Sequence, residues 1–231
     1  MNIKHVAVVI GLLLLACSHP VRAQAPDAGL SAKVIEARKS NAALMHQFTW
    51  NCRTELIDHG KVRDIRIDLV NYGPDGKLQR SLLNDQGSSL PRGFLRRAIA
   101  KGQKQKTEQY LTGLRSLLDQ YTLPTEARVI DFIASANLEF TRAPDGTTLL
   151  QISGNSVVVP GDTLSMWVDM STHATRKVQI KTTYQGDAAD VTATYKTLAA
   201  SHLNHLAMAE VDVPAKGMSL QVHNYDYQQN D

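Results

Sequence analysis

The sequence predicts an α+β domain, in which a curved antiparallel β-sheet of about nine or ten strands is covered on its apolar face by an N-terminal helix and an inserted helical hairpin. Two observations support this fold class. Apolar residues recur at helical spacing near the N-terminus and within residues 91–135, whereas they alternate with polar residues elsewhere. Turn residues separate the alternating runs, as expected of antiparallel strands joined by short loops, and a sheet this wide tends to curl.

Residues 1–23 predict an export signal. Lys4 precedes an apolar run over residues 6–16, which is too short to cross a bilayer because a spanning helix needs about 20 residues. Cleavage after Ala23 releases a soluble chain, whereas the Leu-Leu-Ala-Cys sequence ending at Cys17 resembles the bacterial lipobox. We therefore expect an exported, periplasmic protein, with lipidation of Cys17 and anchoring to the membrane as the alternative.

The mature chain has the length of one domain and an almost balanced charge. Removal of the signal leaves 208 residues with 23 basic and 22 acidic side chains. That length suffices for a sizeable core, and the small net charge argues against nucleic acid as a partner. Residues 24–30 are small and predict a flexible tether, so residues 31–231 are expected to form a single domain and a monomer.

The first part of this domain predicts one helix and three strands. Residues 31–46 have apolar side chains near helical spacing and contain no Gly or Pro. Alternation then predicts strands at residues 47–58 and 62–71, joined by a hairpin turn. Pro74-Asp75-Gly76 supplies the next turn and leads into a third strand at about 77–84.

These strands contain an amphipathic segment and a lone thiol. In the second strand Ile65, Ile67 and Leu69 share one side and charged residues occupy the other, so helices are expected on the apolar side. Cys52, in the first strand, has no partner for an internal disulfide. We expect it to be a small buried residue of the sheet.

The insertion, residues 91–135, combines apolar residues at helical spacing with many basic side chains. Pro124-Thr125-Glu126 begins its last helix. A basic amphipathic helix can lie on an anionic membrane, although a solvated helix face has the same pattern. The candidate contacts with a membrane or a partner are Arg92, Arg96, Arg97 and Lys101.

From residue 137 the alternating pattern continues almost to the end and predicts further strands, including one at 156–160 (SVVVP). The hairpin at residues 161–180 has one apolar side. Methionine on that side can repack around ligands of varied shape, but an ordinary core uses the same residues. The candidate lining of a hydrophobic site is Leu164, Met166, Val168, Met170, Val178 and Ile180.

Two short motifs and the order of elements resemble a known superfamily. Gly161-Asp162 is followed by the strand Met166-Trp167-Val168-Asp169 and a returning strand, and "YGPDGKLQR" is similar to segments of uncharacterised exported proteins. Together they resemble the periplasmic lipoprotein carriers LolA and LolB and the related sensor RseB. The resemblance implies a half-open barrel whose concave apolar face, covered by helices, accepts acyl chains. It also implies an early-strand arginine that holds the lid, for which Arg53, Arg63 and Arg66 are candidates.

No catalytic or metal-binding pattern stands out. The sequence has no Gly-rich phosphate loop, nucleophile elbow or zincin helix, and His202 and His205 lie in a predicted loop without further ligands. Asp64, Asp68, Asp169 and Asp212 fall on polar strand faces and turns. We therefore expect a non-enzymatic protein without cofactor that binds a lipid, an acyl chain or a lipoprotein. The alternative is an RseB-like sensor or interaction module with a solid core.

Overall fold

The computed structural model describes residues 28–86, 94–122 and 125–230, except for the side chains of residues 28, 94–101, 103 and 104. Within this part the chain forms three α-helices, ten strands and one short 3-10 helix, η1. In chain order these are α1 Ala28–Met45, β1 Phe48–Asp58, β2 Lys61–Tyr72, β3 Leu78–Asp85, α2 Phe94–Thr122, α3 Glu126–Ser135, β4 Asn137–Arg142, β5 Thr148–Asn155, β6 Thr163–Asp169, β7 Thr175–Tyr184, β8 Asp187–Thr197, β9 Asn204–Val213, η1 Pro214–Lys216 and β10 Met218–Gln229.

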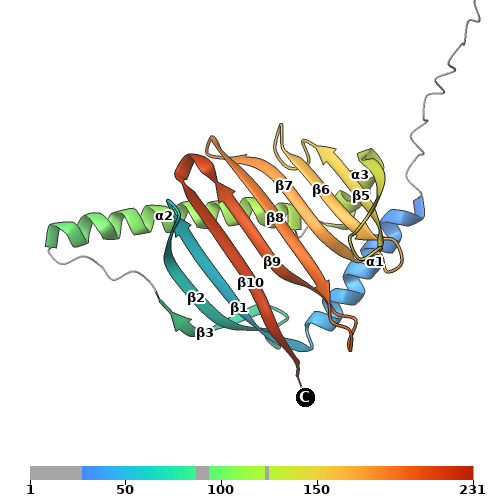
Figure 1. The fold of residues 1–231 in the computed structure, drawn as a ribbon, viewed down its shortest axis with the longest axis horizontal. Helices are drawn as coiled ribbons and strands as arrows, with labels where there is room; N and C mark the ends of the chain where they lie inside the picture. Colours follow the sequence, from blue (N-terminus) through green and yellow to red (C-terminus); the bar gives the residue numbers. More distant parts are fainter. Residues whose placement is uncertain (1–27, 87–93, 123–124, 231) are drawn as a thin grey trace, which may run out of the picture.

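The ten strands form one antiparallel sheet in the order β3-β2-β1-β10-β9-β8-β7-β6-β5-β4. Neighbours in this order are consecutive in the chain, except that β1 pairs with the last strand, β10, over Phe48–Asp58. The sheet is curved and does not close, because β3 and β4 form its two edges (Figure 1). The predicted fold class, an α+β half-open barrel with helices on one side of the sheet, is confirmed.

The helices pack on one face of the sheet, here called the helix face. Figure 1 shows α1 and α2 passing behind the sheet. Leu114 and Tyr121 of α2 are buried against strands β6–β10, and Val34 of α1 and Ile133 of α3 are buried against β5 and β6. Burial of each large apolar side chain contributes about 1.5–3 kcal/mol, so these contacts are the main support of the fold.

Helix α2 crosses the sheet near the turns at one end of the strands. Its Tyr121 hydroxyl donates to Asp162, in the loop between β5 and β6, at 2.6 Å. Its Tyr110 ring contacts Tyr184, at the end of β7, with 5.2 Å between ring centroids. Lys216, between β9 and β10, lies 5.1 Å from the Tyr110 ring centroid. The end of the sheet with these turns, which includes the β1–β2 turn, is here called the α2 end.

The segment at residues 156–160, predicted as a strand, is a loop, so that prediction is wrong. The carboxylate of Asp162 accepts the backbone N–H groups of Val157, Val158 and Val159 at 2.6, 2.8 and 2.7 Å. These amides are therefore unavailable to a strand ladder, and a buried backbone donor needs only one such partner.

Helix α1 begins at Ala28, within the segment predicted as a tether. Leu30, which is buried with Val34 in the core under β5 and β6, explains the earlier start. The rest of the tether and the signal segment, including Cys17, lie outside the described residues.

Candidate functional site

The helix face of the sheet has two halves with different surroundings. Strands β5–β9, with Met218 at the start of β10, form the filled half, where the helices bury the apolar side chains of the sheet. Strands β1–β3 and the rest of β10 form the open half, where several side chains on the same face stay exposed to solvent. The candidate site is the helix face, with the open half as its accessible part.

In the filled half, the predicted lining residues are part of the core of the protein. Leu164 pairs with Ile180, and Met166 with Val178, across β6 and β7. Leu164, Val178 and Ile180 pack with Tyr110, Leu114 and Tyr121 of α2. Val168 is fully buried beneath α1 and α3, and Met170 is partly buried beside it. In this conformation all six residues contact the protein itself, and their contact with a ligand stays a prediction.

Strand β2 turns its charged side to the helix face, which reverses the expectation from its sequence. Cys52 pairs with Asp68, and Trp50 pairs with Val70. Trp50, Cys52 and Val70 form a buried cluster with Met45 of α1, so Asp68 lies on the same side as α1. The apolar residues Ile65, Ile67 and Leu69 alternate with this set and face away from the helices. Because side chains alternate along a strand, the burial of Trp50 and Val70 determines which residues of β2 face the helices and which face away from them.

A buried carboxylate organises the open half. Asp68 is 2% exposed, and both of its oxygens accept from Nε of Arg66, at 2.8 and 2.9 Å. Nη1 of Arg80, from β3, lies 3.6 Å from Asp68 and donates to Sγ of Cys52 at 3.5 Å. A charge removed from water needs such partners. Cys52 itself is 1% exposed, as expected for a structural thiol.

The two guanidinium groups can also contact a ligand. The side chains of Arg66 and Arg80 are 52% and 35% exposed, and each guanidinium has five N–H donors, more than these contacts use. Asp85 faces Arg66 in the β2–β3 register, so the group combines both signs of charge. It can donate to carbonyl or carboxylate oxygens at the edge of an apolar surface.

Of the three candidate lid arginines, Arg66 lies on the helix face beside Asp68. Arg53 pairs with Ile67 in the register, on the opposite face, and forms an ion pair with Glu55. Arg63 lies near the β1–β2 turn and donates to Asp58 at 3.1 Å.

Two leucines of β3 supply the apolar surface of the open half. Leu78 pairs with Tyr72, and Leu82 pairs with Asp68, which places both on the helix face. They are nevertheless 41% and 54% exposed. Sequence reasoning missed them, although leucines on either side of Arg80 at alternate positions are a signal for one apolar strand face.

The predicted basic contacts lie in or before the first turns of α2. Arg92 lies outside the described residues, and for Arg96, Arg97 and Lys101 the structure describes the helical backbone only. In Figure 1 this part of α2 extends beyond the edge of the sheet at β2.

A shallow hollow lies at the end of the sheet opposite the α2 end. It has a volume of about 490 Å³ and is lined by Thr147, Thr148, Asp169, Met170 and Ser171. Burial alone would raise the pKa of Asp169, but hydrogen bonds from Ser171 and from the amide of Thr172 outweigh it and lower the pKa. Met170 is therefore the one predicted lining residue that borders a hollow here, and the rest of its rim is polar.

The two histidines of the SHLNHL segment have different environments. His202 is exposed, whereas His205 is 6% exposed, with its ring centroid 4.1 Å from that of Tyr227. Burial lowers the pKa of His205 below its ordinary value. Among the described residues no three His, Cys, Asp or Glu side chains are close enough to hold a metal ion. Within the same part of the chain, no helix has the length and apolarity required to cross a membrane.

No protein-family model and no curated protein matches the chain. Among solved structures, it is similar to a DUF1329 family protein from Desulfovibrio piger, with 11% identity, TM-score 0.44 and coverage of 88% of this chain and 93% of that one. A putative outer membrane lipoprotein-sorting protein domain from Vibrio parahaemolyticus has 9% identity, TM-score 0.39 and coverage of 88% and 93%. A LolA superfamily protein from Nitrosomonas europaea has 10% identity, TM-score 0.32 and coverage of 86% and 94%. These similarities concern the fold alone.

Proposed function

We propose that the protein is an exported, periplasmic, non-enzymatic binding protein that shelters acyl chains or a lipidated segment on the helix face of its sheet. The observation that carries the proposal is the open half. Leu78 and Leu82 are exposed there, on the same face as the buried Trp50, Cys52 and Val70. An apolar surface that continues from solvent into a core is suited to a hydrophobic guest.

Desolvation supplies the affinity of such a site, at about 25 cal/mol for each Å² of apolar surface buried. An acyl chain first covers the leucines of β3, while Arg66 and Arg80 donate to its carbonyl or carboxylate oxygens. Deeper entry brings the chain to Leu164, Met166, Val168, Met170, Val178 and Ile180. This step requires α2 to move away from the filled half, because its side chains now occupy that space.

Uptake of a fluorescent fatty acid tests this proposal with a matched pair of variants. Leu78→Asp places a charge on the helix face, and Leu69→Asp places the same charge on the opposite face, from similar exposed fractions of 41% and 37%. We expect Leu78→Asp to weaken uptake at least about tenfold, since a charge in an apolar contact costs more than 1.4 kcal/mol. Leu69→Asp should bind like the wild type. Equal binding by both variants, or no uptake by the wild type, would contradict the proposal.

The tight packing of the filled half favours a second candidate, an RseB-like sensor or interaction module that binds a protein partner and no lipid. Native mass spectrometry of protein purified from membranes separates the two functions. Co-purified lipid supports the carrier, whereas a mass without lipid, together with no fatty-acid uptake, supports the interaction module. The same spectrum reports whether Cys17 is present and acylated or the chain begins after Ala23.

An anionic membrane surface is the second proposed partner. The basic residues Arg92, Arg96, Arg97 and Lys101 precede or belong to the part of α2 that extends beyond the sheet. A monomeric carrier must meet a membrane or a second carrier to load and unload, and each basic residue near an anionic surface contributes about 1 kcal/mol.

A further inference from the structure

We propose that the β1–β2 turn, together with α2, forms a docking surface for a bilayer that contains anionic lipids. The surface consists of Lys61, Val62 and Arg63 of β2, Lys106 of α2, and the overhanging first half of α2. It rests on the membrane contact proposed for α2 and deepens it, because it adds residues of the β1–β2 hairpin to that contact, and it holds for either candidate function.

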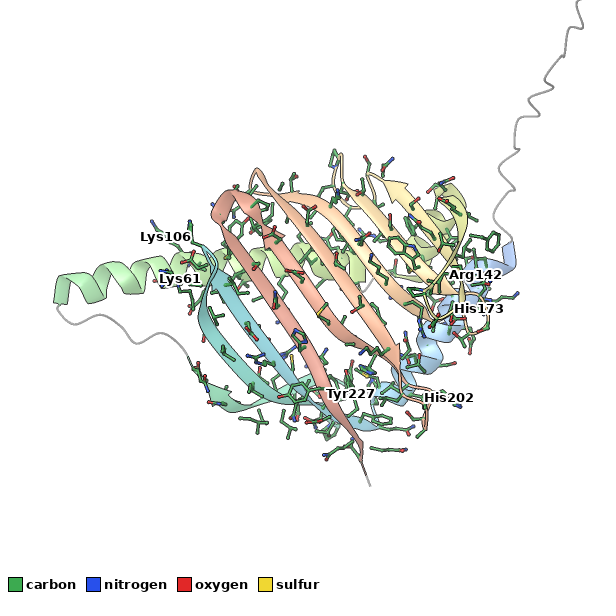
Figure 2. The ribbon with its side chains drawn as sticks, viewed as in Figure 1. Lys61, Lys106, Arg142, His173, His202 and Tyr227 are labelled. Atoms are coloured by element: carbon green, nitrogen blue, oxygen red, sulfur yellow. The ribbon has the colours of Figure 1, made fainter. Side chains whose placement is uncertain are left out.

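A hydrogen bond and a cation–π contact join these elements into one corner of the molecule. The backbone N–H group of His59, in the β1–β2 turn, donates to the backbone carbonyl oxygen of Gly217 at 2.7 Å. The neighbouring Lys216 lies over the ring of Tyr110 in α2, at 5.1 Å. Lys106 precedes Tyr110 by about one helical turn. Figure 2 shows Lys61 and Lys106 at the same end of the molecule, with Arg142 and His173 at the opposite end.

The β1–β2 turn exposes an apolar side chain between two basic ones. Val62 is 51% exposed, although a valine in a strand is ordinarily buried. Lys61 and Arg63, its neighbours in sequence, are also exposed. An apolar residue with basic neighbours suits the boundary between lipid headgroups and acyl chains, where each kind of side chain finds its preferred surroundings.

The overhanging half of α2 has a similar composition in the sequence. Residues 94–107 contain five basic residues and no acidic one, together with Phe94, Leu95 and Ile99. Figure 1 shows this half extending past the sheet, so the sheet does not cover it.

Acidic groups at this corner are fewer than the basic ones. Asp58 binds His59 at 2.7 Å and Arg63 at 3.1 Å, and Asp187 binds Lys216 at 3.2 Å. Glu108 lies two residues after Lys106 in α2, and Asp64 directly follows Arg63 in β2. Because the basic residues outnumber these four carboxylates, the corner attracts an anionic surface, and the exposed Val62 favours a bilayer over nucleic acid.

Co-sedimentation with vesicles tests the proposal on the full mature chain. Vesicles of phosphatidylcholine alone are compared with vesicles that also contain phosphatidylglycerol. We expect binding only to the anionic vesicles, and binding that weakens as salt is added. Reversal of two charges in the variant Lys61→Glu/Arg63→Glu should weaken binding at least about tenfold, and Val62→Asp should weaken it as well.

A second test reverses the charge of Lys61 alone, in the variant Lys61→Glu, which should also weaken binding. Lys77→Glu is its matched control. Lys77 lies in the turn between β2 and β3, at the other end of the same strand, and its side chain is 83% exposed. The control variant should bind like the wild type. Equal loss in Lys77→Glu and Lys61→Glu, unchanged binding of the double variant, or equal binding to neutral vesicles would overturn the proposal. Fatty-acid uptake by the same variants should stay unchanged, which separates a failure of docking from a failure of ligand binding.

Discussion

Replacement of Asp162 by Asn tests the anchor that holds the C-terminal end of α2 on the sheet. The Asp162 side chain is 1% exposed and accepts four hydrogen bonds, from the Tyr121 hydroxyl and from the amides of Val157, Val158 and Val159. An Asn side chain must place its NH₂ group toward at least one of these donors. The least costly orientation loses the bond from Val157, because that donor alone contacts Oδ1.

The expected loss of stability follows from these bonds. A hydrogen bond to a charged group contributes about 1.5–3 kcal/mol, and the remaining bonds lose their charge assistance, so the free energy of unfolding should fall by about 3 kcal/mol. Urea unfolding followed by circular dichroism measures this change. Asp145→Asn is the control, because Asp145 is exposed and accepts from the Thr147 amide in a surface turn, and it should cost less than about 1 kcal/mol.

The same carboxylate sets a pH dependence. Burial alone would raise the pKa of Asp162, but its hydrogen bonds, first the one from Tyr121, outweigh burial and lower the pKa below 3.8. The contribution of the Asp162 carboxylate to the free energy of unfolding is therefore complete above pH 3.8, and it is lost as the pH falls further through the lowered pKa. Asp162→Asn should lose less stability than the wild type over that range. A variant within about 1 kcal/mol of the wild type at neutral pH would refute the anchor.

Three further predictions concern the packing of α2, the buried imidazole of His205 and the buried thiol of Cys52. Leu114→Ala should lower the free energy of unfolding by about 2–5 kcal/mol in urea, because Leu114 is 2% exposed between α2 and the sheet; a loss below about 1 kcal/mol would show that α2 is loosely held. Burial lowers the pKa of His205 below 6.5, so the unfolded chain takes up a proton first as the pH falls, and stability should decrease below pH 6.5 and be insensitive to His205 above it. His205→Gln should remove that part of the pH dependence, and an identical pH profile would contradict it. Cys52, which is 1% exposed, should react with a thiol reagent only on unfolding, and rapid labelling of the native protein would show that the open half is wider than described.

The alternation of apolar residues predicted most of the sheet, because strand periodicity is a local property. The strands predicted at 47–58, 62–71 and 77–84 correspond to β1, β2 and β3 within one residue at each end. The burial of Cys52 also followed from its place in an alternating strand. The local pattern was misleading at Val157–Val159, where a run of β-branched residues resembles a strand. The backbone amides of this run donate to the side-chain carboxylate of Asp162 instead of to a neighbouring strand.

The orientation of β2 could not be predicted from its own residues. Ile65, Ile67 and Leu69 make the more apolar side, but the register with Trp50 and Cys52 turns that side away from the helices. The burial of Asp68 depends on Arg80, which reaches it from β3. Such contacts depend on tertiary pairing, so the open half of the site emerged only from the structure, whereas the filled half had been anticipated as a set of apolar residues.

Photo-cross-linking with a fatty acid that carries a diazirine on its acyl chain tests the central claim most directly. Mass spectrometry of the digested protein then locates the labelled residues. We expect label on Leu78 and Leu82 and, on deeper entry, on Leu164 and Val178, all on the helix face. Label confined to the opposite face, around Ile67 and Leu69, or no label at all, would contradict the claim that this face shelters acyl chains.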